Sequence, residues 1–446
     1  MSRKLKPVEF VNLVNQNMNK KYQTQFPSVD ANNFSDMAKQ LRYAPDQIQN
    51  AWQDTMVDLV KEQFVKNKRA YESPYRKLHI GTTTAFTSQL LMADIVAARN
   101  YSPDANAEEY FEDAKLDIDT QYVDTFKQVH FDVSDNRDAL YAAFLSPEDF
   151  ARYEGMIETR LIDSMEKFDV EMASALLSAN INQGNIYLVP MSKVVDQTTA
   201  LAFTAQLKAI AGDMEVTLSP KYNLAGMHTW TPKDEGVIIS DVNTQAITET
   251  YSLAWAFNQS YLSMQQGGQA MTIGSDTICN GAVFALYGDR YAFEIRDYAG
   301  FPKTTSKFFE NTLTLKRWLH YWALYTISFF NNLVAFADST KIDDSASVTL
   351  GLRSGATAMN KGASDQVYVS ALSVTSGKIF DKFGAYALTG TTDDSTYIDP
   401  VSGKIFIGKN EAGSDVTGLT GKYVTVTFTS HLDANTTATL NIKINS

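Results

Sequence analysis

The chain has 446 residues, of which 44% are hydrophobic and 12% aromatic, so it can bury more than one hydrophobic core. Its 39 Lys and Arg residues against 51 Asp and Glu residues give a net charge of −12. This charge argues against a protein that neutralises nucleic-acid phosphates over its whole surface. The single cysteine, Cys279, cannot form an internal disulfide or a cysteine metal cluster, and it favours a reducing cytoplasm.

The sequence predicts neither export nor membrane insertion. The N-terminal segment is basic but lacks an apolar stretch of the length that a signal peptide requires. The most apolar segment runs from Trp318 to Ala337 and is interrupted by His320, Asn331 and Asn332. We interpret it as a buried strand instead of a transmembrane helix, and we expect no membrane partner.

The first 135 residues divide into two zones. Residues 1–66 are rich in Asn and Gln, and from Pro45 onward apolar residues recur at three- and four-residue steps, which predicts an amphipathic helix. Residues 67–135 contain an acidic stretch and then, near Val129, apolar residues that alternate with polar ones. This second zone is typical of a long excursion with a loop at its tip.

A long helix is predicted over residues 146–180. Ser146 is a good N-cap and Pro147 suits the first helical position. One apolar stripe continues as far as Asn180, so the helix would be about 50 Å long at 1.5 Å per residue. A second helix is expected from about Thr198 to Ala211, followed by mixed strands and short helices. A long, aromatic-rich strand is expected from Phe308 to Phe336.

Beyond Asp338 the composition shifts to Ser, Thr, Gly and Asp. Residues 422–430 and 438–444 alternate between apolar and polar side chains and are separated by a turn-like segment, which predicts a β-hairpin. About 105 residues with this pattern fit an immunoglobulin-like β-sandwich.

No catalytic, cofactor or metal site is predicted. The five histidines lack the H-x-x-x-H or H-E-x-x-H spacing of metal sites, and His130 is expected to face solvent in a strand. Asp117 and Asp119 would share one face of a strand, which we interpret as an ordinary solvated face because apolar residues alternate with them. Cys279 is interpreted as a small buried hydrophobic residue in a strand. The sequence therefore favours a protein that is not an enzyme.

Charges of opposite sign are segregated around residues 67–135. Basic residues gather at its base and acidic residues at its tip: Lys61, Lys66, Lys68, Arg69, Arg76 and Lys77 against Asp104, Glu108, Glu109, Glu112 and Asp113. This pattern fits docking onto a neighbouring copy, and it fits solvated faces without a partner equally well. The docking hypothesis assigns the contacts between subunits to Lys68, Arg69, Arg76, Lys77, Glu108, Glu109 and Glu112. Charge reversal at the three glutamates that left assembly unchanged would contradict it.

Taken together, these zones resemble the major capsid proteins of small podoviruses like phi-29. The resemblance rests on the basic start of the excursion, its acidic tip, the long helix from Pro147 and two aromatic segments. Apart from the helix, the sequences are Pro74-Tyr75-Arg76-Lys77, Ala107-Glu108-Glu109-Tyr110, Arg317-Trp318-Leu319-His320-Tyr321-Trp322 and Phe330-Asn331-Asn332-Leu333-Val334-Ala335-Phe336. The two aromatic segments together look like the final long strand of the capsid core in that family.

The resemblance implies an α+β fold, namely a Hong Kong 97-type phage capsid fold followed by an all-β immunoglobulin-like sandwich. Residues 1–66 would form an N-terminal arm and helix, and residues 67–135 an extended E-loop. Residues 136–339 would form the capsid core, with the spine helix of the peripheral domain at 146–180 and the axial domain at about 215–300. Residues 340–446 would form the sandwich.

The resemblance also implies a function. The chain would self-assemble into the icosahedral shell that encloses the double-stranded DNA genome of a tailed phage. Its partners would be other copies of itself in pentamers and hexamers, a scaffolding protein, the portal or connector, and packaged DNA contacted without sequence specificity. It would be located in the virion after assembly in the host bacterial cytoplasm. The sandwich would tie neighbouring capsomers together or touch the host surface.

Two other classes of protein fit parts of the sequence. The Ser- and Thr-rich C-terminal zone is compatible with a surface-binding protein or adhesin that carries an immunoglobulin-like domain, although neither a signal peptide nor a sorting tail is recognised. A lytic hydrolase with an accessory sandwich would need a nucleophile, a paired acid or a metal cluster, and the residue spacing indicates none of these.

Overall fold

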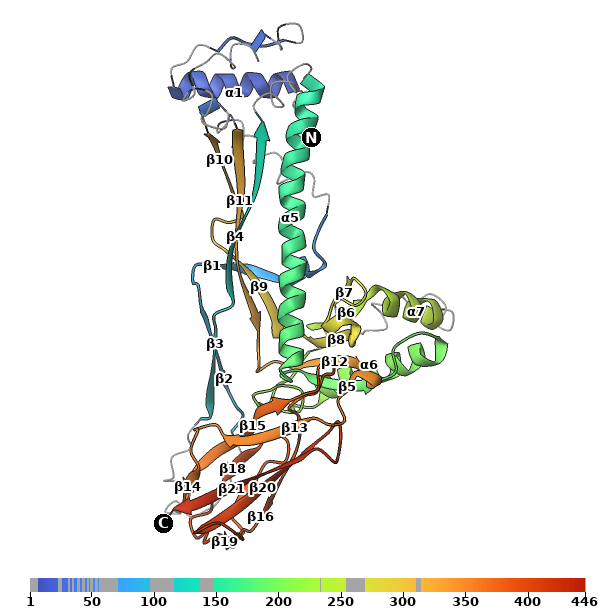
Figure 1. The fold of residues 1–446 in the computed structure, drawn as a ribbon, viewed down its shortest axis with the longest axis vertical. Coiled ribbons are helices and arrows are strands. Elements are labelled where there is room, and N and C mark those ends of the chain that lie inside the picture. Colours follow the sequence, from blue (N-terminus) through green and yellow to red (C-terminus); the bar gives the residue numbers. More distant parts are fainter. Residues whose placement is uncertain are drawn as a thin grey trace, which may run out of the picture. The chain divides into compact units, whose positions relative to one another are not determined.

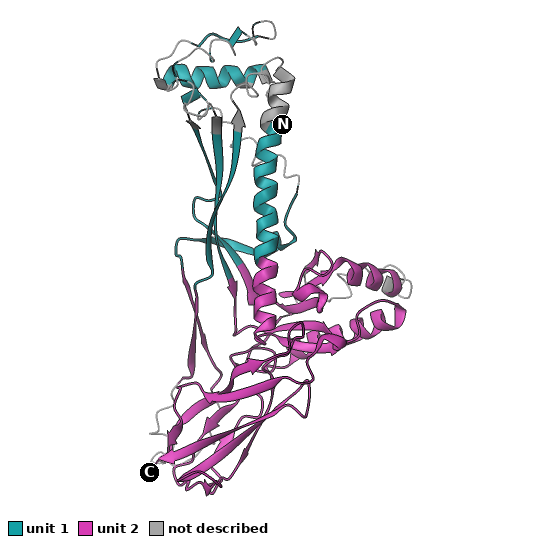
Figure 2. Ribbon diagram, in the orientation of Figure 1, with its two compact units in different colours: residues 1–86, 124–172, 295–325 teal, residues 87–123, 173–294, 326–446 magenta. Residues whose placement is uncertain are grey.

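The computed structural model describes residues 7–22, 26–30, single or paired residues between 33 and 55, and then 71–96, 116–136, 147–232, 234–253, 269–309 and 314–445. The chain divides into two compact units (Figure 2). Unit 1 comprises Met1–Phe86, Asp124–Met172 and Ile295–Tyr325, and unit 2 comprises Thr87–Val123, Ala173–Glu294 and Thr326–Ser446. Both units are therefore discontinuous in sequence.

A five-stranded sheet with long central strands forms the framework of unit 1 (Figure 1). Its strands are β1 (His79–Thr83), β4 (Phe126–Asn136), β9 (Phe293–Tyr298), β10 (Lys303–Phe309) and β11 (Thr314–Ile327). The order is β1-β9-β11-β10, and β4 also pairs with β11. The β4–β11 pairing is antiparallel and runs without a register shift from Phe126–Leu324 to Asn136–Thr314. The alternation near Val129 therefore produces a strand, as predicted, and His130 is exposed as predicted.

The predicted long helix is present as α5 (Pro147–Asn182), whose residues up to Met172 belong to unit 1. Its apolar stripe is buried at Ile157, Leu161 and Met165. The ring of Phe168 lies edge-on to Phe131 on β4, with 5.9 Å between ring centroids. The stripe therefore packs against the sheet, as the 3.6-residue period requires of a helix covering a sheet.

Asparagines of the N-terminal zone hold helix α1 (Pro7–Tyr22), which the sequence analysis did not predict. The Asn12 amide bridges the backbone of Val29 in both directions, accepting from its N–H at 2.6 Å and donating to its C=O at 2.7 Å. Asn15 accepts a hydrogen bond from the Trp52 indole at 2.9 Å. Most of the helix predicted from Pro45 lies outside the described residues.

Unit 2 contains a second five-stranded sheet, in the order β5-β12-β8-β6-β7, with two helices beside it (Figure 1). The elements are β5 (Tyr187–Met191), α6 (Gln197–Val216), β6 (Gly236–Asp241), α7 (Val242–Leu253), β7 (Gln269–Ile273), β8 (Val283–Asp289) and β12 (Leu333–Asp338). The Phe203 ring of α6 packs edge-on against Phe284 and Phe336, at centroid distances of 5.8 and 5.1 Å. Helix α6 begins with a capping box between Asp196 and Thr199.

The prediction of one long strand over Phe308–Phe336 is wrong. Strand β11 ends at Ile327, and β12 begins at Leu333 in a different sheet. Between them the Ser328 hydroxyl donates to Asn331 Oδ1 at 2.7 Å. The buried Asn332 side chain accepts from the hydroxyl of Thr229 at 2.9 Å and donates to that of Thr231 at 3.1 Å. A short polar side chain that bonds locally, as Ser328 does to Asn331, ends a strand even in an aromatic-rich segment.

The C-terminal residues of unit 2 form two sheets that share one core. The first has the order β13-β15-β18-β17 and the second β14-β21-β20-β16, with β19 also paired to β20. The strands are β13 (Ser347–Leu352), β14 (Ala358–Asn360), β15 (Ser364–Ser373), β16 (Gly384–Thr389), β17 (Tyr397–Ile398), β18 (Lys404–Phe406), β19 (Ser414–Asp415), β20 (Lys422–Ser430) and β21 (Thr437–Asn445). Their inward side chains form a single buried cluster. We call this part the C-terminal sandwich, and its β20–β21 hairpin confirms the predicted one.

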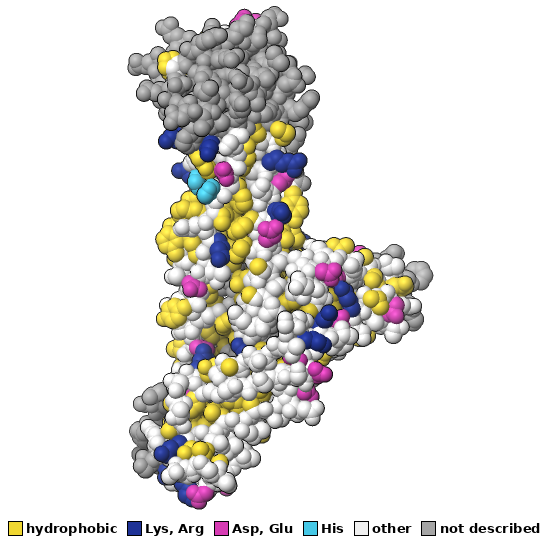
Figure 3. Space-filling model, in the orientation of Figure 1, with side chains coloured by type: hydrophobic (Ala, Val, Ile, Leu, Met, Phe, Trp, Pro, Cys, Tyr) yellow, Lys and Arg dark blue, Asp and Glu magenta, His cyan; other side chains and the backbone are white. Residues whose placement is uncertain are grey.

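Short 3-10 helices complete the chain: η1 (Pro74–Leu78), η3 (Cys279–Gly281), η4 (Arg290–Ala292) and η5 (Ser339–Lys341). Among the described residues no helix is long and apolar enough to cross a membrane. Most of the sandwich surface visible in Figure 3 is neither hydrophobic nor charged, which reflects its Ser- and Thr-rich composition.

Candidate functional site

A two-stranded ribbon of β2 (Ser88–Ala93) and β3 (Ile118–Val123) has two different faces. The ribbon belongs to unit 2, and on its inner face Leu90 and Met92 pack against Ala225, Met227 and Phe330 of the same unit. The outer face is exposed, as described below. The ribbon is thus attached by one face only.

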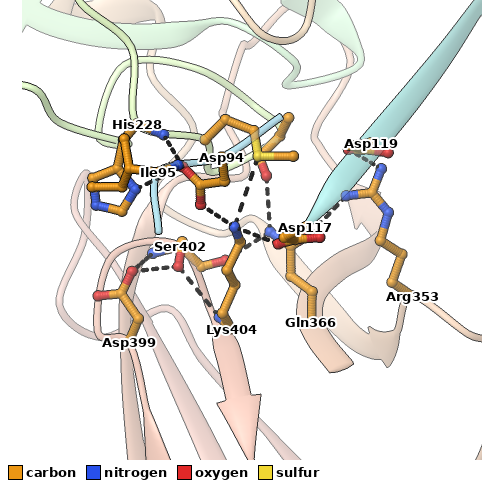
Figure 4. A network of polar contacts seen from close by, with 12 residues as sticks. Asp94, Ile95, Asp117, Asp119, His228, Arg353, Gln366, Asp399, Ser402 and Lys404 are labelled. Atoms are coloured by element: carbon orange, nitrogen blue, oxygen red, sulfur yellow. Dashed lines mark hydrogen bonds and ion pairs between the residues drawn. The ribbon is translucent and has the colours of Figure 1, made fainter. Parts of the chain in front are cut away.

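The end of the ribbon is held by a set of charged residues that we call the ribbon anchor: Asp94, Asp117, Asp119, His228, Arg353 and Lys404 (Figure 4). The Lys404 ammonium, on β18 of the sandwich, contacts Asp94 directly and lies 2.7 Å from the Asp117 carboxylate. Asp94 Oδ1 also accepts from the backbone N–H of His228 and lies 3.0 Å from its ring Nδ1. One lysine therefore joins both strands' ends to the sandwich.

A second cation engages the same ribbon. Arg353 pairs with Asp119 of β3, and its Nη1 donates to the Gln366 side chain at 2.8 Å. The Gln366 amide donates in turn to the carbonyls of Ala225, at 3.0 Å, and Ser402, at 2.8 Å. The buried Gln366 side chain thus links the ribbon, the sandwich and the residue 225 segment through hydrogen bonds.

The charges of the anchor stabilise one another's ionised forms. Burial would raise the pKa of Asp94, but Lys404 and His228 outweigh it and lower that pKa to about 2. Burial likewise opposes protonation of Lys404, but the two carboxylates outweigh it and raise its pKa. At neutral pH these groups are therefore charged and paired, an arrangement suited to holding position. No set of three or more possible metal ligands occurs within the described part of the chain.

Unit 1 contains a separate buried cluster around Asp169. This carboxylate accepts hydrogen bonds from the hydroxyls of Tyr321, at 3.2 Å, and Tyr325, at 3.0 Å. The His79 ring lies between two carboxylates, with Nε2 3.0 Å from Asp169 and Nδ1 3.2 Å from Asp297. Burial opposes protonation of His79, yet the two carboxylates outweigh it and raise its pKa to about 9. We interpret the cluster as a structural junction between α5, β9 and β11.

Replacing His79 by Gln is expected to lower the thermal unfolding midpoint of the protein at pH 6. A raised pKa means that the stabilisation by His79 is fully present below the unfolded value of about 6.5 and is lost as pH rises through about 9. The difference in midpoint between wild type and H79Q should therefore shrink between pH 6 and pH 9.5 in calorimetric scans. A gap that stays constant or widens would contradict a charged His79.

The structure describes only part of the predicted docking residues. Lys68, Arg69, Glu108, Glu109 and Glu112 lie outside the described residues. Arg76 and Lys77 lie on η1, where the Arg76 guanidinium is 3.8 Å from Asp297 and is partly buried. Arg76 is thus already engaged by a carboxylate of its own chain. The Lys77 side chain is exposed.

The interpretation of Cys279 is wrong, and that of Asp117 and Asp119 is wrong in part. Asp117 and Asp119 were predicted to form a solvated face; the Asp117 side chain is 58% exposed, as predicted, but that of Asp119 is only 11% exposed, and both pair with cations of the sandwich. Cys279 does not lie in a strand: it begins η3, is half-buried and has a φ of 48°, and its neighbour Asn280 has a φ of 51°. Positive φ angles do not fit a strand. Burial raises the pKa of the Cys279 thiol to about 11.

The residues of the ribbon anchor carried no local signal in the sequence. Asp94 and Lys404 are 310 positions apart, and no motif spacing relates them. Only the i, i+2 spacing of Asp117 and Asp119 indicated that charged residues lie together at the strand that became β3. A search for carboxylates that flank a loop at both ends could have singled out Asp94 and Asp117, whose backbones pair at 2.9 Å.

Comparisons with known proteins place the chain in a family. The model of the Phi29-like phage major capsid protein family matches residues 11–337. The major capsid protein of Bacillus phage GA-1 is 25% identical over 306 residues, which cover 67% of this chain and 63% of that protein. That of Bacillus phage B103 is 22% identical over 379 residues, covering 83% of this chain and 81% of that protein.

Solved structures with similar folds are more distant. A capsid structure of Staphylococcus phage Andhra has a TM-score of 0.49 at 12% identity, covering 61% of this chain and 86% of that one. A capsid structure of cyanophage P-SCSP1u has a TM-score of 0.42 at 10% identity, covering 63% and 94%. Because the family model spans the arm, both sheets, the long helix and the ribbon, the chain belongs to the Phi29-like phage major capsid protein family, as its sequence predicted.

Proposed function

We propose that this chain is the major capsid protein of a tailed phage and that its copies assemble into the icosahedral shell around the double-stranded DNA genome. Membership of the capsid protein family supports this, and a structural role without catalysis is part of the proposal. The proposal includes a Hong Kong 97-type core followed by an immunoglobulin-like sandwich. It also includes assembly in the host cytoplasm with a scaffolding protein and a portal, and contact with packaged DNA without sequence specificity.

The observation that carries the proposal is the outer face of the ribbon. Leu91, Ile118 and Tyr122 lie on this face with exposed fractions of 63%, 59% and 76%. Three more apolar side chains, Ile95, Val96 and Leu116, are exposed just beyond the strands. Several exposed apolar side chains on one face of an element that is held by its other face mark an interaction site, because leaving them in water is unfavourable. A protein that builds a shell from its own copies needs such a surface.

We assign this outer face to contact with a neighbouring copy, and the ribbon anchor to holding the face in position. The anchor fixes the inner side and the end of the ribbon within its own chain, so the outer side is presented without a large loss of conformational freedom on binding. The charged contacts proposed for Lys68, Arg69, Lys77, Glu108, Glu109 and Glu112 would add to this apolar contact. Arg76 would have to leave Asp297 to take part.

Replacing Leu91 and Tyr122 together by Asp is expected to reduce the yield of shells at least tenfold. The two carboxylates would have to be buried against a neighbouring copy, which costs several kcal/mol in total. Gradient sedimentation and electron microscopy of the protein, expressed alone and with a scaffolding protein, measure the yield. The unfolding midpoint of the subunit should change little, because both side chains are exposed.

The matched control is Tyr397→Asp, because Tyr397 of the sandwich is 61% exposed and lies in a strand as Tyr122 does. It should leave shell yield unchanged. Normal shells from the ribbon variant would exclude the outer face as a contact. Soluble monomers of wild type under every condition, with or without scaffolding protein, would overturn the capsid function itself.

A further inference from the structure

A cavity of about 590 Å³ lies within unit 2, at the side of the sandwich where β15 and β16 meet the residue 220–226 segment. Its volume falls within the range of about 300–1,000 Å³ that is typical of ligand pockets. The walls carry two ammonium groups, from Lys221 and Lys382, and five Phe or Tyr side chains, from Tyr187, Phe329, Tyr368, Phe383 and Tyr386. The lining thus combines apolar surface with positive charge.

The two lysines have no carboxylate partner among the described residues. Lys221 Nζ lies over the Tyr222 ring, 4.9 Å from its centroid, and 5.9 Å from that of Tyr187. Lys382 Nζ donates to the Asn185 side chain at 3.0 Å, and burial lowers its pKa. The Lys221 ammonium is exposed and that of Lys382 is half-buried, and an anion that enters beside such groups forms charge-assisted hydrogen bonds with them.

The carboxylates near the cavity are already engaged. Asp381 is fully buried and accepts from the N–H of Leu188 at 2.7 Å, from that of Phe383 at 3.2 Å and from His431 Nε2 at 2.8 Å. Asp213 accepts from the Tyr222 hydroxyl at 2.6 Å. Neither can turn toward the lysines without breaking these bonds. Both carboxylates are therefore held by other donors, and neither is paired with Lys221 or Lys382.

One segment of this chain has the matching chemistry. Residues 108–113 read Glu-Glu-Tyr-Phe-Glu-Asp, so four carboxylates and two aromatic rings occur within six residues. We propose that the cavity binds residues 108–113 of a second copy of this chain, with their carboxylates at Lys221 and Lys382 and their rings against the aromatic walls. This inference rests on the proposed function, because a shell requires contacts between copies. It assigns the acidic residues 108–113 to cationic partners other than Arg76.

The test uses a fluorescein-labelled synthetic peptide of residues 104–113 and the full-length chain, kept too dilute to form particles. Fluorescence anisotropy should show binding that weakens at least tenfold in the K221Q/K382Q double variant. The control K361Q/K443Q removes two exposed lysines of the sandwich outside the cavity and should leave affinity unchanged. A peptide in which all five side-chain carboxylates, including that of Asp104, are converted to amides should also bind at least tenfold more weakly.

Several results would overturn the inference. The first is that the wild-type chain does not bind the peptide. The second is that the K221Q/K382Q and K361Q/K443Q variants bind it with equal affinity. The third is that the amide peptide binds as tightly as the original peptide. A chain carrying E108Q, E109Q, E112Q and D113N that binds the peptide more than tenfold tighter than wild type would show that each chain fills its own cavity, which contradicts the second copy as source. Wild-type shells without peptide binding would refute this inference alone, whereas peptide binding without shells would refute the proposed function.

Discussion

Replacing Lys404 by methionine is expected to weaken the attachment of the ribbon by about 2 kcal/mol, or roughly 30-fold in its opening equilibrium. Asp94 is almost fully buried, so without the ammonium its carboxylate keeps only the His228 contacts and its local backbone bonds. Hydrogen exchange of the amides in β2 and β3, followed by mass spectrometry, measures this loss. In the K404M variant the exchange rate of the β2 and β3 amides should rise, while the exchange rate of the β20 amides stays unchanged.

The control for this prediction is Lys422→Met, which removes an exposed ion pair with Asp415 and should alter exchange less than twofold. Converting Asp94 to Asn in the Lys404→Met background should restore part of the protection, because the uncompensated charge is then gone. Since the folded pKa of Asp94 is lowered to about 2, the wild-type attachment should be constant above pH 5 and weaken as pH falls through 4 toward 2. Unchanged exchange in K404M would show that the anchor holds nothing.

Replacing Asp381 by Asn is expected to have the largest effect on thermal stability. The fully buried carboxylate accepts three hydrogen bonds, from β5, from its own turn and from His431. An amide would turn an N–H toward at least one of these donors, which costs about 3 kcal/mol. Calorimetric scans should show the midpoint of unit 2 falling by roughly 6–10 °C.

Asp415→Asn is the matched control, because Asp415 lies on the same sandwich but its side chain is 82% exposed. Its midpoint should remain within 1 °C of wild type. If D381N were as stable as wild type, then the bonds of Asp381 would not contribute to joining β5 and the sandwich. The K404M and D381N variants together test whether contacts of the sandwich stabilise the rest of unit 2.

The contacts of the sandwich bear on its role. Lys404, Arg353 and Asp381 all bond to residues of the same chain, in the ribbon or in β5. From the sequence, the expected roles were a tie between neighbouring capsomers or contact with the host surface. A third role follows from these bonds: the sandwich holds the ribbon of its own subunit in the position from which the outer face is presented.

The sequence by itself determined the elements whose signal is local. Helix α5 was predictable because an apolar stripe with a 3.6-residue period, preceded by Pro147, specifies a helix and the face that it buries. The β20–β21 hairpin was predictable because alternation specifies strands that are buried on one side. The family was predictable as well, because the order of such segments along the chain is itself a sequence property.

Only the tertiary structure decided which distant side chains meet. The aromatic segment is divided between two sheets, because β11 pairs in one and β12 in the other. The break between them includes Asn332, which bonds to Thr229 and Thr231, and these partners are distant in sequence. The pairing of Asp94 with Lys404 spans 310 positions, and His79 meets Asp169 across 90. The periodicity of apolar residues indicates which side of a helix or strand is buried. An ion pair between distant residues depends on how the elements pack together, and no local sequence pattern indicates this packing.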